Sequence, residues 1–255
     1  MADSSASFSA KQYRDDKKFH VVLAATGSVA TIKLPNIAEA LCRHPSISVR
    51  IIVTQSAERF LVGQSLEQPI LDSLRQIKGV DAVYRDDDEW ATPWTRGANI
   101  LHIELRKVNI EHIYWVIRKQ LTISKWAHVL LIAPLSANTM AKMSVGIADN
   151  LLLSVVRAWD TTGLVDQDFK VQKPRIFVAP AMNTAMWHQP ITHQNLGILR
   201  DQWGWSPTNP EGWVTVLPPI DKPLACGDVG SGGMMDWKDI VRSIEEHLGL
   251  LAVQS

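Results

Sequence analysis

Four short and predominantly apolar runs, each ending in a small polar loop, constrain the fold of this chain more than any other feature. The runs occupy residues 20–25, 49–53, 129–133 and 175–179. Continuous apolar residues, as opposed to alternating ones, are typical of parallel strands that have helices on both faces. Helical patterns follow the first three loops, so the sequence predicts repeated strand–loop–helix units.

These units predict a single α/β domain with a doubly wound parallel sheet in three layers (α/β/α), of the Rossmann-like or flavodoxin-like kind. The chain has 255 residues, of which 46% are hydrophobic, and this is enough for the core of one domain. We place the domain at residues 19–250. Residues 1–18 are polar and lack periodicity, so we expect them to form a mobile N-terminal arm.

The composition excludes several classes of function. The 26 basic and 26 acidic residues leave no net charge with which to attract nucleic acid. No apolar stretch reaches the roughly 20 residues that a membrane-spanning helix needs, and the N-terminus lacks the apolar segment of a signal peptide. The two cysteines fit neither a disulfide framework nor a zinc pattern. We therefore expect a cytoplasmic protein without a bound metal, and any cofactor should be organic.

The loops after the apolar runs carry groups that suit a phosphorylated ligand. In an open parallel sheet the carboxyl ends of the strands share one edge, where ligands bind. Gly27 and Ser28 follow the first run and open a helix, so they offer backbone N–H groups to a phosphate. The segment matches neither GxGxxG nor GxxxxGK[ST], which disfavours a dinucleotide or a triphosphate. Further hydroxyl and amide groups at this edge are those of Ser56, Ser136, Asn138 and Thr139. Together they favour a monophosphate attached to a polar heteroaromatic ring.

Three side chains are candidates for chemistry, although each also has a structural alternative. His102 lies where an apolar stretch meets a charged one. Asn183 follows the fourth apolar run, where its amide could bind a carboxylate or carbonyl, or only form a turn. Cys226 lies in a glycine-rich segment, which suits an acid or nucleophile on a flexible lid. The acidic residues 86–89 are expected to form a solvated surface turn.

Longer motifs narrow these alternatives. In chain order, from about residue 20 to residue 236, they read LAATGSVA, VTQSAERF, LHIELR, IAPLSANTMAKMSVGIADNLL, VRAWD, VAPAMNTAMW and LACGDVGSGGM. Together they resemble the homo-oligomeric flavin-containing cysteine decarboxylases, a family that includes the phosphopantothenoylcysteine decarboxylases. The resemblance implies FMN as the cofactor and trimers with the FMN site between subunits. The trimer would be a homotrimer, or a heterotrimer with a related subunit.

The resemblance also implies roles for individual residues. His102 matches the active-site base of the family, and Cys226 matches the acid on a flap that covers the substrate. Asn183, Met186 and Ala225 match substrate-binding positions. The positions that match flavin contacts are Gly27, Ser28, Val29, Ser56, Phe60, Ser136, Ala137, Asn138, Thr139 and Ala181.

The reaction implied by the resemblance is the FMN-dependent decarboxylation of 4'-phosphopantothenoyl-cysteine to 4'-phosphopantetheine, in coenzyme A biosynthesis. Oxidation of the carbon that bears the thiol gives a thioaldehyde, whose C=S group accepts the electrons left by the departing CO₂. The hydride then returns from the flavin while Cys226 supplies a proton, so there is no net redox change. In this scheme the cofactor supplies the redox chemistry and the protein supplies position and electrostatics.

Other interpretations remain. Fungal halotolerance proteins of the same fold inhibit a type 1 protein phosphatase, so a regulatory subunit is the main alternative. Those relatives tend to carry an acidic C-terminal tail, whereas this sequence ends in Leu-Ala-Val-Gln-Ser. A decarboxylase of peptide C-terminal cysteines and a prenyl-flavin synthase are further alternatives, and the ACGD and PAMNTAMW motifs argue against both.

Two segments depart from the family pattern. Residues 108–124 interrupt the usual passage from HIELR to the next strand, and they are either a true insertion or an intron translated in frame. Because of this interruption, either Lys107 or Lys125 could take the basic position that follows HIELR, which is usually arginine. Lysine lacks the bidentate geometry of a guanidinium group. Residues 162–173 are polar and are expected to extend a surface loop.

Overall fold

The centre of the molecule is a six-stranded parallel sheet. The computed structural model describes residues 8–9, 16, 18–65, 67–91, 93–107, 128–162, 174–223 and 229–251. The strands of the sheet are β1 (Phe19–Ala25), β2 (Ile47–Val53), β3 (Val80–Arg85), β4 (Val129–Leu135), β5 (Arg175–Pro180) and β6 (Val214–Val216). Their order is β3-β2-β1-β4-β5-β6, which is the strand order of the Rossmann fold. A separate antiparallel pair consists of β7 (Ile220–Pro223) and β8 (Val229–Gly233).

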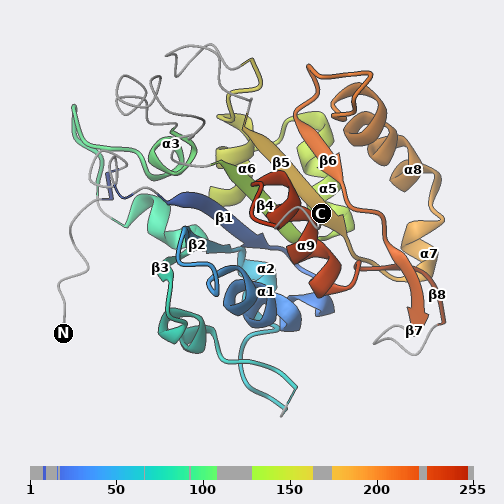
Figure 1. Cartoon of the computed structure of the whole chain (residues 1–255), viewed down its shortest axis with the longest axis horizontal. Helices are drawn as coiled ribbons and strands as arrows, with labels where there is room; N and C mark the ends of the chain where they lie inside the picture. Colours follow the sequence, from blue (N-terminus) through green and yellow to red (C-terminus); the bar gives the residue numbers. More distant parts are fainter. Residues whose placement is uncertain are drawn as a thin grey trace.

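Helices cover both faces of this sheet because successive strand residues point to opposite sides. Val21 and Leu23 of β1 belong to a core that includes residues of α1 (Leu34–Leu41) and α9 (Trp237–His247). Val22 and Ala24 belong to the opposite core, which includes residues of α5 (Ala137–Val145) and α6 (Leu151–Arg157). Figure 1 shows α1 and α9 in front of the sheet and α5 and α6 behind it. The remaining helices are η2 (Val29–Lys33), α2 (Gln55–Glu58), η3 (Leu71–Gln76), η4 (Asp86–Trp90), α3 (Leu101–Arg106), α7 (Thr184–Trp187), α8 (Pro190–Gly197) and the π-helix η5 (Ile198–Gln202).

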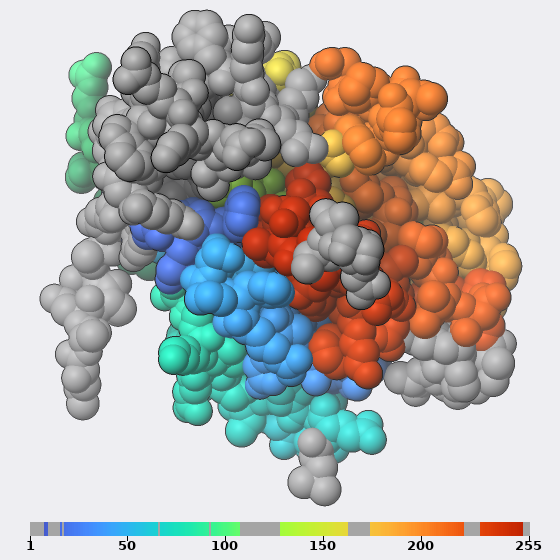
Figure 2. All heavy atoms as spheres, viewed as in Figure 1, coloured from blue at the N-terminus to red at the C-terminus, as the bar shows by residue number. Residues whose placement is uncertain are grey.

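The last helix closes one face of the domain. The hydrophobic residues Ile240, Val241 and Ile244 of α9 are buried, and α9 packs against α1. In the space-filling view the red atoms of α9 lie against the blue atoms of the N-terminal third of the chain (Figure 2). Segments from the two ends of the sequence therefore share one core.

The predicted fold class is confirmed, and each of the four predicted strands is present. The sequence gives no comparable signal for β3, because this strand lies at the edge of the sheet and most of its residues are only partly buried. An edge strand needs no continuous apolar run, since part of its surface faces solvent. No helix in the described part of the chain has the length and apolar character needed to cross a membrane.

The predicted N-terminal arm and insertions fall largely outside the described residues. Within the arm, the Arg50 guanidinium lies 3.8 Å from the centre of the Phe8 ring, and Asp16 Oδ2 lies 2.9 Å from His20 Nε2. Residues 108–124 lie wholly outside the described part, as do residues 163–173 of the second segment. The boundaries of the arm and of both insertions therefore stay predictions.

Candidate active site

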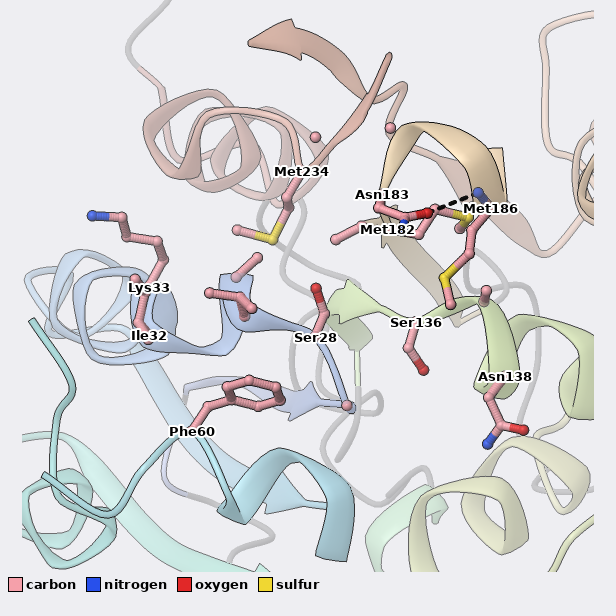
Figure 3. Close-up of a pocket in the computed structure, with 17 residues that line it drawn as sticks. Ser28, Ile32, Lys33, Phe60, Ser136, Asn138, Met182, Asn183, Met186 and Met234 are labelled. Atoms are coloured by element: carbon pink, nitrogen blue, oxygen red, sulfur yellow. Dashed lines mark hydrogen bonds between the residues drawn. The ribbon is translucent and has the colours of Figure 1, made fainter. Parts of the chain in front are cut away.

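A cavity lies where the strand order reverses between β1 and β4. Ligands of doubly wound folds bind at this point because the neighbouring loops diverge there. The cavity has a volume of about 460 Å³. Its lining residues are Gly27, Ser28, Val29, Ala30, Ile32, Lys33, Phe60, Ser136, Ala137, Asn138, Ala181, Met182, Asn183, Met186, Gly232, Gly233 and Met234. Figure 3 shows Phe60 and Met234 on opposite sides, with Ser28 between them.

Hydrogen bonds join the loop after β1 to the loop after β4. The backbone N–H of Ser136 donates to Thr26 Oγ1 at 2.7 Å, and the Thr26 hydroxyl donates to the Pro134 carbonyl at 2.9 Å. Ser136 also caps α5, because its Oγ accepts from the backbone N–H of Thr139 at 3.3 Å. Thr26 is fully buried. These contacts hold two walls of the cavity in a fixed relative position.

The loop after β2 meets the β1 loop closely enough to require a glycine. A Cβ atom added at Gly27 would lie 2.7 Å from the Cβ of Ser56, closer than packed carbon atoms approach. Next to this contact is a second cavity of about 220 Å³. It is lined by Gly27, Thr54, Gln55, Ser56, Asp86, Ser136, Asn138, Thr139, Lys142, Asp149 and Asn150. The two cavities adjoin, since Gly27, Ser136 and Asn138 line both.

The loop after β5 supplies a short apolar wall and an amide. Ala181 is almost fully buried, and its N–H donates to the Leu135 carbonyl at 2.9 Å. Asn183 caps α7, because its Oδ1 accepts from the Met186 N–H at 2.8 Å. This bond uses the amide oxygen and leaves the Nδ2 hydrogens to donate. The Met182 N–H donates to the Gly232 carbonyl at 2.9 Å, which ties this wall to β8.

The larger cavity and the smaller one differ in charge. Among the described residues that line the larger cavity, Lys33 alone carries a charge, and Figure 3 shows its ammonium group directed away from the other labelled side chains. The smaller cavity contains the Lys142–Asp149 ion pair, at 2.5 Å, and Asp86. Burial raises the pKa of Asp86, although a hydrogen bond from the Gln55 N–H at 2.8 Å opposes the rise. Within the described residues, no group of three or more potential metal ligands occurs.

His102 lies outside both cavities and has a carboxylate partner. Its Nδ1 is 2.8 Å from Glu89 Oε1, and the Glu89 side chain is 4% exposed. The prediction of a solvated turn over residues 86–89 is therefore wrong for Asp86 and Glu89. The two carboxylates bond to Gln55 and His102, which are distant in the sequence and not visible to local pattern analysis.

Comparison with known proteins assigns the family. The profile of the family described as Flavoprotein matches residues 9–249. The chain belongs to the flavoprotein family. Within it, the chain is 41% identical over 221 residues to a phosphopantothenoylcysteine decarboxylase of Arabidopsis thaliana, covering 86% of this chain and 80% of the relative. The resemblance found in the sequence motifs is thus confirmed.

Solved structures of flavoproteins agree with this assignment. A PPC decarboxylase mutant complexed with pantothenoylaminoethenethiol is 38% identical, with a TM-score of 0.66, covering 91% of this chain and 99% of that one. The FMN binding protein AtHal3 is also 38% identical, with a TM-score of 0.64 and coverage of 92% and 99%. Some flavoprotein relatives are much longer. The chain spans 30% of a probable thymidylate synthase of Schizosaccharomyces pombe, to which it is 40% identical, and 35% of the coenzyme A biosynthesis protein 3 of Saccharomyces cerevisiae.

Most site residues predicted from the flavoprotein motifs lie together in the structure. Those in the larger cavity are Gly27, Ser28, Val29, Phe60, Ser136, Ala137, Asn138, Ala181, Asn183 and Met186. Ser56 and Thr139 line the smaller cavity. His102 is separate from both, and Ala225 and Cys226 lie outside the described residues. Lys107 is described, and its ammonium group pairs with the buried carboxylate of Glu104, whereas Lys125 lies outside the described part.

Several residues that shape the site were given no role from the flavoprotein motifs, although one of them, Thr26, lies within the motif LAATGSVA. Thr26, Lys33 and Glu89 are the clearest of these. Thr26 precedes the Gly27–Ser28 loop and Lys33 follows it, so their positions in the sequence could have indicated that they lie near the site. Glu89 lies in an acidic run, where nothing local distinguishes a buried carboxylate from solvated ones.

Proposed function

We propose that the chain binds FMN and decarboxylates 4'-phosphopantothenoyl-cysteine to 4'-phosphopantetheine, a step of coenzyme A biosynthesis. The observation that carries the proposal is that most of the predicted flavin contacts, together with Asn183 and Met186, which are predicted to bind substrate, lie around one cavity. Membership of the flavoprotein family and the similarity to phosphopantothenoylcysteine decarboxylases support it.

The two adjoining cavities suit the two ends of FMN. The larger one has an apolar lining that includes Phe60, Ala181 and Met234, and its volume falls in the usual range for organic ligands. The smaller one presents the hydroxyl groups of Ser56 and Thr139 beside the N-terminus of α5, which favours an anion. We place the ring system in the larger cavity and the phosphate in the smaller one. Because burial raises the pKa of Asp86, this neighbouring carboxyl group is more easily protonated next to an anion.

When bound, FMN would supply reversible hydride chemistry at the carbon that bears the substrate thiol. The residues of the chain bind and orient the substrate for this chemistry. The free Nδ2 hydrogens of Asn183 would donate to the substrate carboxylate, whose desolvation is otherwise costly. Lys33, which lines the larger cavity, would attract the substrate phosphate. We assign the proton transfers to His102 and Cys226.

The separation of His102 from the cavity supports the proposal that a second copy completes the site. Figure 1 shows α3, which carries His102, and α7, which begins after Asn183, at opposite ends of the molecule. One copy therefore does not bring these two side chains to the same small substrate. Both ends expose apolar side chains, with Trp90 and Trp94 following Glu89, and Val29 and Met186 beside the cavity. We propose a head-to-tail homotrimer in which each His102 faces the cavity of the next copy.

Mixing two inactive variants tests this arrangement. His102→Asn removes one half of each site and Asn183→Asp removes the other, so each variant alone should be inactive. When the two are unfolded together and refolded, random assembly pairs an intact half from each neighbour in about one quarter of the sites. Recovery of about one quarter of wild-type CO₂ release is therefore expected. If assemblies that are shown by mass to contain both variants release no CO₂, a site shared between copies is contradicted.

The activity itself is tested on the purified full chain. We expect a yellow protein with the absorbance of FMN that releases CO₂ from 4'-phosphopantothenoyl-cysteine. A colourless protein that fails to take up added FMN would overturn the proposal. Inhibition of a type 1 protein phosphatase without CO₂ release would support the regulatory alternative instead. The cytoplasmic location stays a prediction, which imaging of the tagged chain would test.

A further inference from the structure

We propose that Glu89 is a positioning residue that holds His102 in the one tautomer able to act as a base through Nε2. The inference rests on the proposed decarboxylase function and adds to it a residue that the motifs did not indicate. It starts from the short contact between Glu89 Oε1 and His102 Nδ1, at 2.8 Å.

The chemistry of the two groups determines the direction of this hydrogen bond. A carboxylate has no hydrogen to donate, so Glu89 can only accept from the imidazole. The hydrogen therefore lies on Nδ1, and in the neutral ring Nε2 keeps its lone pair. Nε2 lies on the far side of the ring from Glu89, and the His102 side chain is 22% exposed. The basic nitrogen is thus the one turned away from Glu89 and available to an incoming group.

The Glu89 side chain is buried in a position that is unfavourable for a carboxylate. Its side chain is 4% exposed, and within the described residues its Oε2 is buried without a hydrogen-bond partner. Burying an unpaired oxygen of this kind is unfavourable, because the oxygen loses the hydrogen bonds that water would otherwise donate to it. A glutamate at a surface turn could avoid this cost by pointing into solvent, since the neighbouring Asp87 is exposed. The cost is explained if the contact with His102 is needed for function.

The helices that carry Glu89 and His102 are each held in place by contacts with other parts of the domain. Helix η4 begins at Asp86, whose carboxylate accepts from the Gln55 N–H, and Asp88 accepts from the Arg85 N–H at 2.7 Å. Helix α3 is anchored by Leu105, which is fully buried in the core. The imidazole is therefore oriented by a rigid support and not by a mobile side chain.

This orientation serves a single proton transfer. When a substrate thiol reaches His102, its S–H bond breaks, the proton goes to Nε2, and the bonding electrons stay on sulfur as a thiolate. The ring is then an imidazolium, and the Glu89 carboxylate stabilises the positive charge through the same Nδ1–H contact.

The Glu89→Gln variant tests the proposal, with Asp87→Asn as the matched control. Gln keeps the shape of Glu but its amide nitrogen can donate to Nδ1, which permits the other tautomer. We expect kcat to fall at least about 10-fold in Glu89→Gln, the lower end of the range for carboxylates that orient metal-ligating histidines, with little change in KM. Asp87 is exposed on the same helix, so Asp87→Asn should retain wild-type kcat after losing the same charge. Unchanged FMN absorbance and unfolding temperature would exclude a folding defect.

A spectroscopic measurement separates tautomer control from other effects. In protein labelled with ¹⁵N-histidine, with His102 assigned by comparison with His102→Asn, wild type should show hydrogen on Nδ1. The Glu89→Gln signals should move toward the other tautomer. If kcat or the ring signals are unchanged in Glu89→Gln, the proposal is wrong. If wild type itself releases no CO₂, the proposed function fails, while the ring signals still report on the Glu89–His102 contact.

Discussion

The Thr26 hydroxyl accepts a hydrogen bond from the Ser136 backbone N–H at 2.7 Å and donates its own hydrogen to the Pro134 carbonyl at 2.9 Å. One buried side chain therefore joins the loops that follow β1 and β4. A third contact adds to this, because the Thr31 hydroxyl donates to the Thr26 carbonyl at 3.0 Å. The distance between two walls of the cavity depends on this residue, which itself does not line the cavity.

Thr26→Val should weaken both the fold and cofactor binding. Valine has the same shape but leaves the buried Ser136 N–H without its partner, and a buried unsatisfied group of this kind costs about 1–3 kcal/mol. The Pro134 carbonyl keeps the hydrogen bond from the Thr26 backbone N–H at 3.2 Å. We expect a lower free energy of unfolding in urea and a higher Kd for FMN. Thr26→Ser keeps the hydroxyl, so it should restore FMN affinity and lose only about 1 kcal/mol for the missing methyl group. Equal FMN affinity in Thr26→Val and wild type would contradict the assigned role.

Gly27→Ala should loosen FMN binding by separating two loops. The added methyl group would lie 2.7 Å from Ser56 Cβ, so one loop must move. Overpacking of this kind costs about 1–3 kcal/mol, which corresponds to a Kd for FMN raised at least about fivefold. Gly197→Ala is the control, because that glycine lies in α8 and the nearest neighbour of its new methyl group would be 3.6 Å away. Fluorescence titration of the apoprotein with FMN measures both variants.

Substitutions at Asn183 should separate its capping role from its contact with substrate. Asn183→Asp retains an oxygen that can cap α7, so stability should change little, but its negative charge would repel the substrate carboxylate. Asn183→Ala removes the cap and should cost about 1 kcal/mol. We therefore expect CO₂ release to be lost in Asn183→Asp at a nearly unchanged unfolding temperature. Normal turnover by this variant would remove Asn183 from the substrate site.

His247 should make the domain less stable in mild acid. Burial, with a smaller contribution from the charge of Arg175, lowers the pKa of His247 to about 4. In the unfolded chain the pKa is about 6.5, so below this pH the unfolded state takes up a proton that the folded state resists. This histidine should therefore lower the free energy of unfolding by roughly 3 kcal/mol as the pH falls from about 6.5 to about 4.

The measurement for this effect is the difference between variants. Urea unfolding at several pH values should show a weaker dependence on pH in His247→Gln than in wild type. His188→Gln is the control, because His188 is exposed. If His247→Gln and wild type lose stability in parallel, His247 is not the group responsible.

Much of the fold and the cavity could be predicted because both depend on short segments. A buried central strand needs a continuous apolar run, and a loop at its carboxyl end needs small polar residues, so both leave a local pattern. Ser136, Asn183 and their helices illustrate this, since each residue caps the helix that follows it.

The contacts that escaped prediction join segments far apart in the sequence. The Glu89–His102 hydrogen bond spans 13 residues and the Thr26–Ser136 bond spans 110, and neither has a periodicity that marks it. An acidic run has the same composition whether its members are solvated or buried. Only the packing of η4 against its neighbours distinguishes Glu89 from Asp87.

The placement of α3 and α7 at opposite ends of one copy has a consequence for the behaviour of dilute protein (Figure 1). An isolated chain could hold cofactor yet lack the imidazole needed for turnover. Specific activity should therefore decline when the protein is diluted below the concentration at which copies associate. The amount of FMN bound per chain should decline less. In a cell, the rate of catalysis would then rise more than in proportion to the concentration of this chain.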